Sequence, residues 1–552
     1  MSLFSGLYVG TSGLQTAQNA LNTVAHNMTN VDTEGYTRQQ VSQVTRPYNT
    51  ISKAGSAVSY QQVGLGVSYA EVKQVRDFFL DRSYRRESGR GGFYDVSCDA
   101  IEEIEEIFQE LDGETFSNAL NNLWVSVQEL DKDPANSVNQ GVFLHRCNEF
   151  ITRAQAVYEN LVEYQDDLNF TVKQKVDKIN SLGKEIEDLN ERILKIESGK
   201  VEHANDLRDQ RNQKVDELSK MASMSLATDV DGNFLIQIEG VDFVTAGDVK
   251  EIGLYVDPTT EFYTPYWKML AEYDTNGDVI PSSLESARVF DLSMEISTEL
   301  NTDIGGLKSA IVARGDHRAT YKDLQQTTNY PTDPDANPYV YDDIKESVVM
   351  NVMAEFDGLI HDVTKGINDT IEKAVLDYYN ISDVSLLTGN ETYLVDDSTK
   401  LPYKIFTLSL DKDGYTTTNL SINEKLLQAP SLLGFVRPDE IVDQKCADSL
   451  KNLFAEETHL LNPEVKTKTN LASYYNALIS QVSSTGFVMR GISESQEITV
   501  NNIASAREEV VGVSSDEELS NMIMFQNAYN ASSRFINVMN ELSEHIINTL
   551  GM

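Results

Sequence analysis

The residue types that most often carry out chemistry are present in this chain, but they are not grouped at the spacings that chemistry needs. The seven histidines lie far apart, and no HExxH pair of zinc ligands occurs. The segment that begins at Asp274 resembles a calcium loop, but Val279 stands where that loop needs glycine, so a β-turn is the plainer interpretation. Gly64-Leu65-Gly66 lacks the third glycine of a nucleotide-binding motif. We therefore predict no catalytic residue, no cofactor and no metal site.

Carboxylates dominate the charge of the chain. There are 86 acidic and 45 basic side chains, which give a formal net charge of −41. Because such a surface repels phosphate backbones and anionic lipids, we predict no nucleic acid and no membrane among its partners. The three cysteines, Cys98, Cys147 and Cys446, form no CxxC pair and are predicted to be free thiols. At roughly 150 residues per domain, a chain of 552 residues predicts three or four domains.

One stretch departs from this acidity. Two explanations fit its crowded arginines: a contact for an acidic neighbour, or a solvated helix face, which we favour. The stretch contains Arg76, Phe78, Phe79, Arg82, Tyr84, Arg85, Arg86 and Arg90.

The first thirty residues carry a heptad stripe that indicates a helix in search of a partner. Leu7, Leu14, Leu21 and Met28 are seven residues apart, and the side chains between them are polar and nearly uncharged. Such a stripe suits packing against neighbouring subunits. The alternative is an ordinary terminal helix that docks on its own domain.

A second long helix is predicted at the C-terminal side of the chain. Ser515 to Glu518 form a capping box, and apolar residues then follow at intervals of three, four or seven over more than thirty residues. Since each terminal helix has an apolar face, we predict that the two helices pair. The stripe of the second helix includes Phe525, Tyr529, Ile536, Met539 and Ile546.

Proline placement separates helical from turn-rich regions. Ten of the twelve prolines lie from Pro258 to Pro463, so long helices are permitted on either side. Helix is predicted from about 99 to 221, with a coiled-coil-like stripe between Val172 and Ile196. In the middle, strands are predicted at 234–238, 241–244 and 404–410, helices at 284–322 and 344–377, a loop at 330–342 and a turn at 411–414.

These elements predict a mainly α fold with β-rich inserted domains. The paired N- and C-terminal helices form a coiled-coil rod, beside a long helical domain and mixed or β middle domains. The predicted domains are an N-terminal assembly helix and turn at 1–60, the first part of the helical rod domain at 61–225, β-rich or mixed outer domains with a helical insert at 226–430, the second part of the rod domain at 431–512 and a C-terminal assembly helix at 513–552.

Segments near both termini resemble the signatures of flagellar rod, hook and hook-associated proteins. The first signature spans 12–14, 17–21 and 27–39, where Gly35 can turn the chain sharply out of the helix. The second spans 518–529 and continues through Arg534 in the form FQxAYxASxR. Further segments are similar to the members of this family that join the hook to the filament: 77–82, 204–211, 419–423 and 506–514.

The resemblance implies a structural subunit of the bacterial flagellum, and not an enzyme. It implies secretion through the flagellar type III apparatus, without a cleaved signal peptide, to an extracellular site on the flagellum. The terminal helices of many copies are expected to line the axial tube as a homo-oligomeric ring. The other expected partners are hook protein, a neighbouring hook-associated protein and a flagellar export chaperone that masks the C-terminal stripe.

We predict that the terminal segments are poorly ordered in the monomer and become ordered when neighbouring copies bury their stripes. Two alternatives stay open: another axial protein (hook or second junction protein), or an adhesin or enzyme carried by the middle domain. The predicted assembly interface consists of Leu7, Leu14, Leu21, Met28, Gly35, Tyr36, Phe525, Tyr529, Ile536, Met539 and Ile546.

Overall fold

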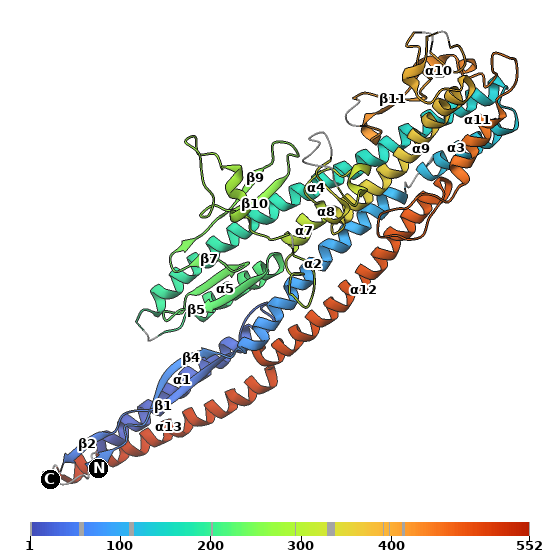
Figure 1. Ribbon diagram of the computed structural model, residues 1–552. Helices are drawn as coiled ribbons and strands as arrows, with labels where there is room; N and C mark the ends of the chain where they lie inside the picture. The colour runs from blue at the N-terminus through green and yellow to red at the C-terminus, as the bar shows by residue number, and fades with distance from the viewer. Residues whose placement is uncertain are drawn as a thin grey trace.

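The chain forms an elongated molecule built on long helices (Figure 1). Both termini lie at one end of the rod, where a few strands accompany the terminal helices, and a β-rich outer domain projects to one side of the middle of the molecule. The predicted turn at 411–414 and most of the predicted loop at 330–342 lie outside the described residues. The computed structural model describes residues 3–53, 60–109, 115–199, 202–292, 294–327, 337–389, 391–396, 398–410 and 414–550.

The terminal helices pair, as the sequence predicted. Helix α1 (Leu3–Thr29) lies antiparallel to α13 (Ser515–Leu550) along the narrow end of the molecule (Figure 1). Their pairing explains why each carries an apolar face, since each covers part of the other.

A strand region that the sequence analysis missed packs on α1. Residues 1–60 were expected to hold only a helix and a turn, and the helical rod was expected from 61 onward. These strands are rich in glutamine, serine and lysine, so they lack the hydrophobic alternation that marks a strand in sequence. The antiparallel pairs are β1 (Gln39–Thr45) with β4 (Val67–Gln74), and β2 (Asn49–Lys53) with β3 (Tyr60–Val63).

The rod is a bundle of helices whose long members run side by side (Figure 1). Its first helix begins at Phe78, about twenty residues before the predicted start of the helical region. The rod helices are α2 (Phe78–Gln109), α3 (Phe116–Lys132), the N-terminal half of α4 (Ser137–Glu197), α9 (Val348–Tyr379), α11 (Gln444–Ala455) and α12 (Leu471–Val511).

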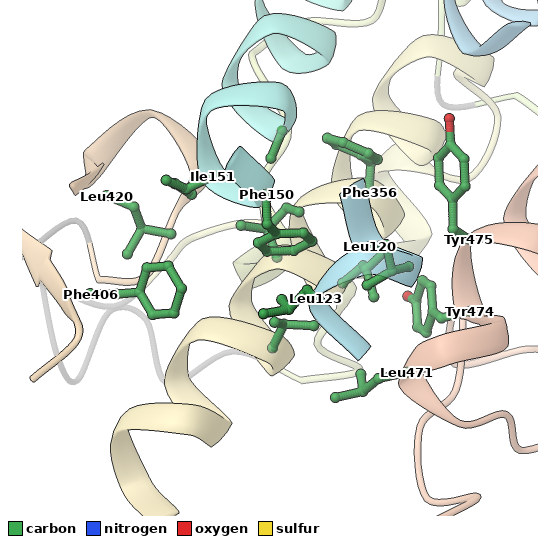
Figure 2. Close-up of a cluster of buried hydrophobic side chains, with 14 of the residues drawn as sticks. Leu120, Leu123, Phe150, Ile151, Phe356, Phe406, Leu420, Leu471, Tyr474 and Tyr475 are labelled. Carbon is green, nitrogen blue, oxygen red and sulfur yellow. The ribbon is translucent and has the colours of Figure 1, made fainter. Parts of the chain in front are cut away.

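Aromatic side chains from distant parts of the sequence fill the core of this bundle (Figure 2). Phe116 of α3 lies with its ring centroid 4.9 Å from that of Phe356 of α9 and 4.8 Å from that of Tyr475 of α12. Phe406 and Leu420 enter the same cluster from the far end of the rod, where short elements cap it. These are β11 (Phe406–Leu408), β12 (Leu420–Ile422) and α10 (Glu424–Gln428), whereas the short helix α8 (Tyr341–Ile344) lies along the middle of the molecule (Figure 1).

The second half of α4 carries the β-rich outer domain. The predicted stripe from Val172 to Ile193 is buried, but its partners are α5 (Asn205–Met221), α7 (Gly306–Arg314) and the strands, rather than one long coiled-coil helix; Ile196 is exposed. A 3.6-residue stripe needs an apolar partner and does not specify its type, which is why the coiled-coil prediction was wrong. The strands are β5 (Met224–Thr228), β6 (Phe234–Ile238), β7 (Val241–Thr245) and β8 (Asp248–Val249) in one antiparallel sheet, and β9 (Ile252–Val256) with β10 (Tyr263–Trp267) in another.

The predicted helix at 284–322 is also wrong. Only α6 (Leu284–Ala287), α7 (Gly306–Arg314) and a single 3₁₀ turn are helical there. Between α6 and α7, Thr302 Oγ1 donates to the carbonyl of Glu295, and Gly305 has a φ of +100°, a conformation outside the helical range. Local side-chain bonds of this kind compete with the helix, and composition alone does not reveal them.

Asparagines on the faces of helices bind strand backbones at several points in the fold. Asn180 of α4 donates to the carbonyl of Ile252 at 2.8 Å and accepts from the amide of Ile252 at 3.0 Å, so its side chain acts as one more strand residue. Asn190 makes the same pair of bonds to Phe234. These contacts fix the outer domain on α4.

Asn180→Ala is expected to loosen the β9 edge without unfolding the rod. The change leaves one N–H and one C=O of Ile252 without their partner, at a cost of about 1–3 kcal/mol. The measurement is amide hydrogen exchange at Ile252 against that of rod helix α9. Asn180→Asp keeps the bond to the N–H and loses the bond to the C=O, so its exchange rate should lie between those of wild type and the alanine variant. Equal protection in all three proteins contradicts the role of Asn180.

Candidate assembly interface at the paired termini

Small residues on α1 allow the two terminal helices to approach closely. A Cβ added at Gly10 would lie 2.7 Å from Cγ1 of Ile536, and one at Gly13 would lie 2.8 Å from Oγ of Ser532. Gly6 leaves equally little room beside Met539. A contact this tight excludes any larger side chain on the α1 side, so the glycines set the distance between the helices.

The predicted seam residues flank this contact. Leu7, Leu14, Leu21 and Met28 follow the glycine face by one position and are all half-buried. The heptad pattern predicted that these larger residues lie at the centre of the helix pair. In the structure, glycine and alanine lie there instead, because two helices pack most closely through small side chains. Ala17, Ala20 and Val24 continue the glycine face and are buried.

On α13, the predicted residues divide into two groups. Phe525, Tyr529, Ile536 and Met539 are half-buried on the face toward α1, whereas Ile546 is exposed. The structure therefore brings four of the five into the intramolecular pair. Whether they also contact neighbouring copies stays a prediction.

A second apolar face of α13, here called the outer stripe, flanks the face that packs on α1. Its members recur at helical spacing and remain partly exposed, although the ring of Phe535 also reaches Gly10 of α1. The sequence did not lead us to predict this second face, although spacings of three and four residues along α13 could have revealed it. The outer stripe consists of Met524, Phe535, Val538, Leu542 and Ile546, which are between 38% and 54% exposed.

The turn after α1 is fixed by Gly35 and Tyr36. Gly35 has a φ of +75°, and its α-carbon is so close to the Gln213 amide that no Cβ fits. The Tyr36 hydroxyl donates to Oδ1 of Asn27 at 2.8 Å and lies 2.9 Å from Nδ1 of His26. These contacts aim the chain from α1 toward β1, which is the sharp turn that glycine at this position predicted.

Asp209 of α5 joins this turn to the outer domain. Its carboxylate accepts from the backbone amide of Thr37 at 3.1 Å and from the Thr37 hydroxyl at 2.5 Å, and the Gln74 side chain donates to it at 2.8 Å. Burial raises the pKa of Asp209 to about 6. The joint between the terminal pair and the rest of the molecule is therefore sensitive to pH.

The pH dependence has a definite sign. Because the pKa of Asp209 is about 6 in the folded protein and about 3.9 when unfolded, its stabilising contribution is complete below pH 4 and is lost as the pH rises through 6. We expect the free energy of unfolding of wild type, minus that of Asp209→Asn, to fall between pH 4 and pH 6 and to level off above pH 7. Urea titrations across this range provide the measurement. A difference that rises with pH refutes the assignment.

The arginine stretch of α2 is an ion-pair network within the chain. Arg85 Nε lies 2.6 Å from Asp216, and Arg90 Nε lies 3.0 Å from Asp303. Arg507, at the end of α12, lies 2.7 Å from Asp216 as well. The favoured explanation, a solvated helix face, is therefore wrong for Arg85 and Arg90, whose acidic neighbours belong to the same chain, whereas Arg82 is exposed. The network fixes α2, α5 and α12 together just above the terminal pair.

The described residues offer little for chemistry. They contain no group of three or more His, Cys, Asp or Glu side chains placed to hold a metal ion. Asp274 Oδ1 accepts from the amides of Asn276 and Asp278 and forms a turn. No helix in the described part of the chain has both the length and the apolar character needed to cross a bilayer.

Comparison with known proteins shows which proteins the chain resembles. The model of the flagellar hook-associated protein FlgK helical domain matches residues 101–284. The family model of the flagella basal body rod protein matches residues 7–37. The family model of the flagellar basal body rod FlgEFG protein C-terminal region matches residues 504–549. Flagellar hook-associated protein 1 of Bacillus subtilis is 25% identical over 561 residues, which cover 100% of this chain and 99% of that protein. The chain is therefore similar, along its whole length, to flagellar hook-associated proteins.

Further relatives agree along the whole length. Flagellar hook-associated protein 1 of Salmonella typhimurium is 23% identical over 569 residues, covering 97% of this chain and 98% of its own. The flagellar hook junction protein FlgK of Burkholderia pseudomallei has a solved structure that matches with a TM-score of 0.51 at 12% identity, over 77% of this chain and 99% of that one. This likeness shows a shared fold. Its similarity to flagellar hook-associated proteins over the whole chain supports a structural role in the flagellum.

Proposed function

We propose that this chain is the subunit that joins the hook to the filament, and that its copies form a ring through their terminal helices. The observation that carries the proposal is the outer stripe, an apolar face that remains about half exposed after α1 and α13 have paired. A helix that is apolar on two faces needs a second partner, and another copy in a tubular wall supplies one.

The outer stripe is large enough to drive this association. Burial of a whole large apolar side chain contributes about 1.5–3 kcal/mol, so the five half-exposed members contribute roughly 1 kcal/mol each when a neighbour covers them. Association also carries an entropy cost, which favours a ring in which every copy makes two such contacts over an isolated dimer. The stripe lies at the end of the molecule that holds both termini (Figure 1).

Similarity along the whole chain favours this role over the two alternatives. The relatives named flagellar hook-associated protein 1 align over 97% to 100% of the chain, including its middle. An adhesin or enzyme carried by the middle domain predicts similarity confined to the ends. Another axial protein, hook or second junction protein, predicts relatives of another name.

The proposal includes export and folding partners. The chain leaves the cell through the flagellar type III apparatus without a cleaved signal peptide, with an export chaperone over the C-terminal stripe. At the tip of the hook its terminal helices become fully ordered as neighbouring copies bury the outer stripe, so that the ring contacts hook protein on one side and the next hook-associated protein on the other. The chain catalyses no reaction.

Deletion of the gene tests the role. The expected phenotype is a cell with hooks but without filaments, which sheds filament subunits into the medium. Complementation with the wild-type gene restores filaments. A deletion strain with normal filaments contradicts the proposal, and a strain without hooks assigns the chain to an earlier axial component.

A further inference from the structure

A large cavity lies between the rod and the outer domain. It has a volume of about 910 Å³ and is bounded by β4 and the start of α2 on one side and by α5, β5 and β6 on the other. Its walls combine apolar side chains, such as Val72, Leu226 and Phe234, with cations. The assembly role described above does not use it.

The charge of this cavity is opposite to that of the chain. Seven lysines and arginines line it against two carboxylates, in a protein whose formal net charge is −41. Five of these cations have carboxylate partners; Arg208, for example, is paired with Glu197. Arg82 and Arg211 have no ion-pair partner among the described residues. The cavity therefore has two positive charges in excess.

Arg211 is the more informative of the two. It is only 2% exposed, stacks on the ring of Phe234 at 3.6 Å, and donates through Nη1 to Asn190 and to the carbonyl of Gly232. Its Nε–H has no acceptor within the described structure. Burial and the neighbouring Arg208 lower the pKa of Arg211 to about 9. A buried guanidinium that lacks a counter-charge and has a free donor is suited to accept an anion.

The mouth of the cavity is apolar and open. Phe78, which lines it, is 80% exposed, and the adjacent Phe79 is 75% exposed. Two exposed phenylalanines beside an uncompensated arginine are typical of a protein-binding surface, where aromatic residues and arginine are enriched. The occupant is therefore a peptide segment with carboxylate and apolar side chains, rather than a small ion alone.

We infer that this cavity binds an acidic segment of a second copy of the chain, whose carboxylates meet Arg82 and Arg211 and whose apolar side chains cover Phe78. Charge complementarity selects this occupant, since the surface of every copy is strongly acidic apart from such local sites. The inference rests on the proposed ring, which brings copies together at high local concentration. It adds a contact beside the rod to the contacts made by the terminal helices.

Binding to the monomer tests the cavity first. Hexaglutamate serves as the probe for the full-length chain, and calorimetry at low and high salt measures its affinity. We expect binding that weakens with salt and that falls at least tenfold in Arg82→Glu and in Arg211→Gln. Arg82→Glu is needed because Arg211→Gln also removes the bonds to Asn190. Arg192→Glu, an equal charge change on an exposed position of α4, is the matched control and should bind as wild type does. Equal affinity in Arg82→Glu and Arg192→Glu overturns the inference.

Crosslinking in assembled protein tests the occupant. A benzophenone amino acid in place of Phe78 is expected to crosslink to a segment of another copy that contains Asp or Glu. Crosslinks only within one chain, or only to a different flagellar protein, overturn the inference. The Val538→Asp variant distinguishes the cavity contact from the terminal-helix contact of the proposed function. If this variant no longer forms rings but still binds hexaglutamate, the cavity and the outer stripe act independently. A wild-type chain that binds hexaglutamate but never assembles contradicts the proposed function.

Discussion

Val538→Asp is expected to yield a folded monomer that does not assemble. Val538 lies in the middle of the outer stripe and is 51% exposed, so a carboxylate there is solvated in the isolated chain and changes the free energy of unfolding by only about 0.5 kcal/mol. In the assembled wall the same carboxylate loses its water without a counter-charge, which costs about 3–5 kcal/mol per contact. Sedimentation of the purified protein and filament counts in a complemented deletion strain measure the effect.

Asn537→Asp is the matched control for this variant. Asn537 is the preceding residue on α13, is exposed, and lies on the opposite side of the helix from the outer stripe. The Asn537→Asp variant carries the same added charge on the same helix and is expected to assemble normally. Loss of assembly in both variants points to net charge, and normal assembly in both shows that α13 meets neighbours through another face.

The amphipathic stripes of the sequence predicted helices well and their partners less well. The stripe from Val172 to Ile193 is buried as expected, but it packs on α5 and a sheet. Similarly, the heptad leucines of α1 lie beside the helix contact and not at its centre. Periodicity identifies the face that is buried, whereas the shape of the partner depends on long-range packing that one segment does not contain.

Other features were beyond local patterns altogether. The carboxylates that pair with Arg85 and Arg90 are 131 and 213 residues away, so composition suggested free cations where the fold makes ion pairs. The strands β1 and β4 pack on α1 but carry many polar side chains, so their sequence shows no regular hydrophobic alternation. By contrast, the turn at Gly35 could be predicted, because a positive φ depends on residues a few positions apart. The cap of α13 was predicted one residue too late: the Ser514 hydroxyl, and not that of Ser515, accepts from the backbone amide of Glu517.

Gly10→Ala is expected to weaken the terminal pair. The added methyl group would lie 2.7 Å from Cγ1 of Ile536 and 3.1 Å from Cδ1 of Phe535, so α1 and α13 must move apart or repack, at a cost of about 1–3 kcal/mol. Amide exchange along α1 and α13 measures the loss, and ring assembly should fall with it because the outer stripe is then no longer held in place.

The opposite sign is expected at Gly491. This glycine lies inside α12, and a Cβ there meets nothing within 4 Å, so Gly491→Ala should stabilise its helix by about 0.5–1 kcal/mol through backbone entropy alone.

A double variant tests the contact between Gly10 and Ile536 directly. Because Ile536→Ala makes room for the methyl group at position 10, Gly10→Ala/Ile536→Ala should lose less stability than the sum of the losses in the two single variants. Additive losses would place Gly10 and Ile536 out of contact and remove the steric basis for the pairing of the two terminal helices.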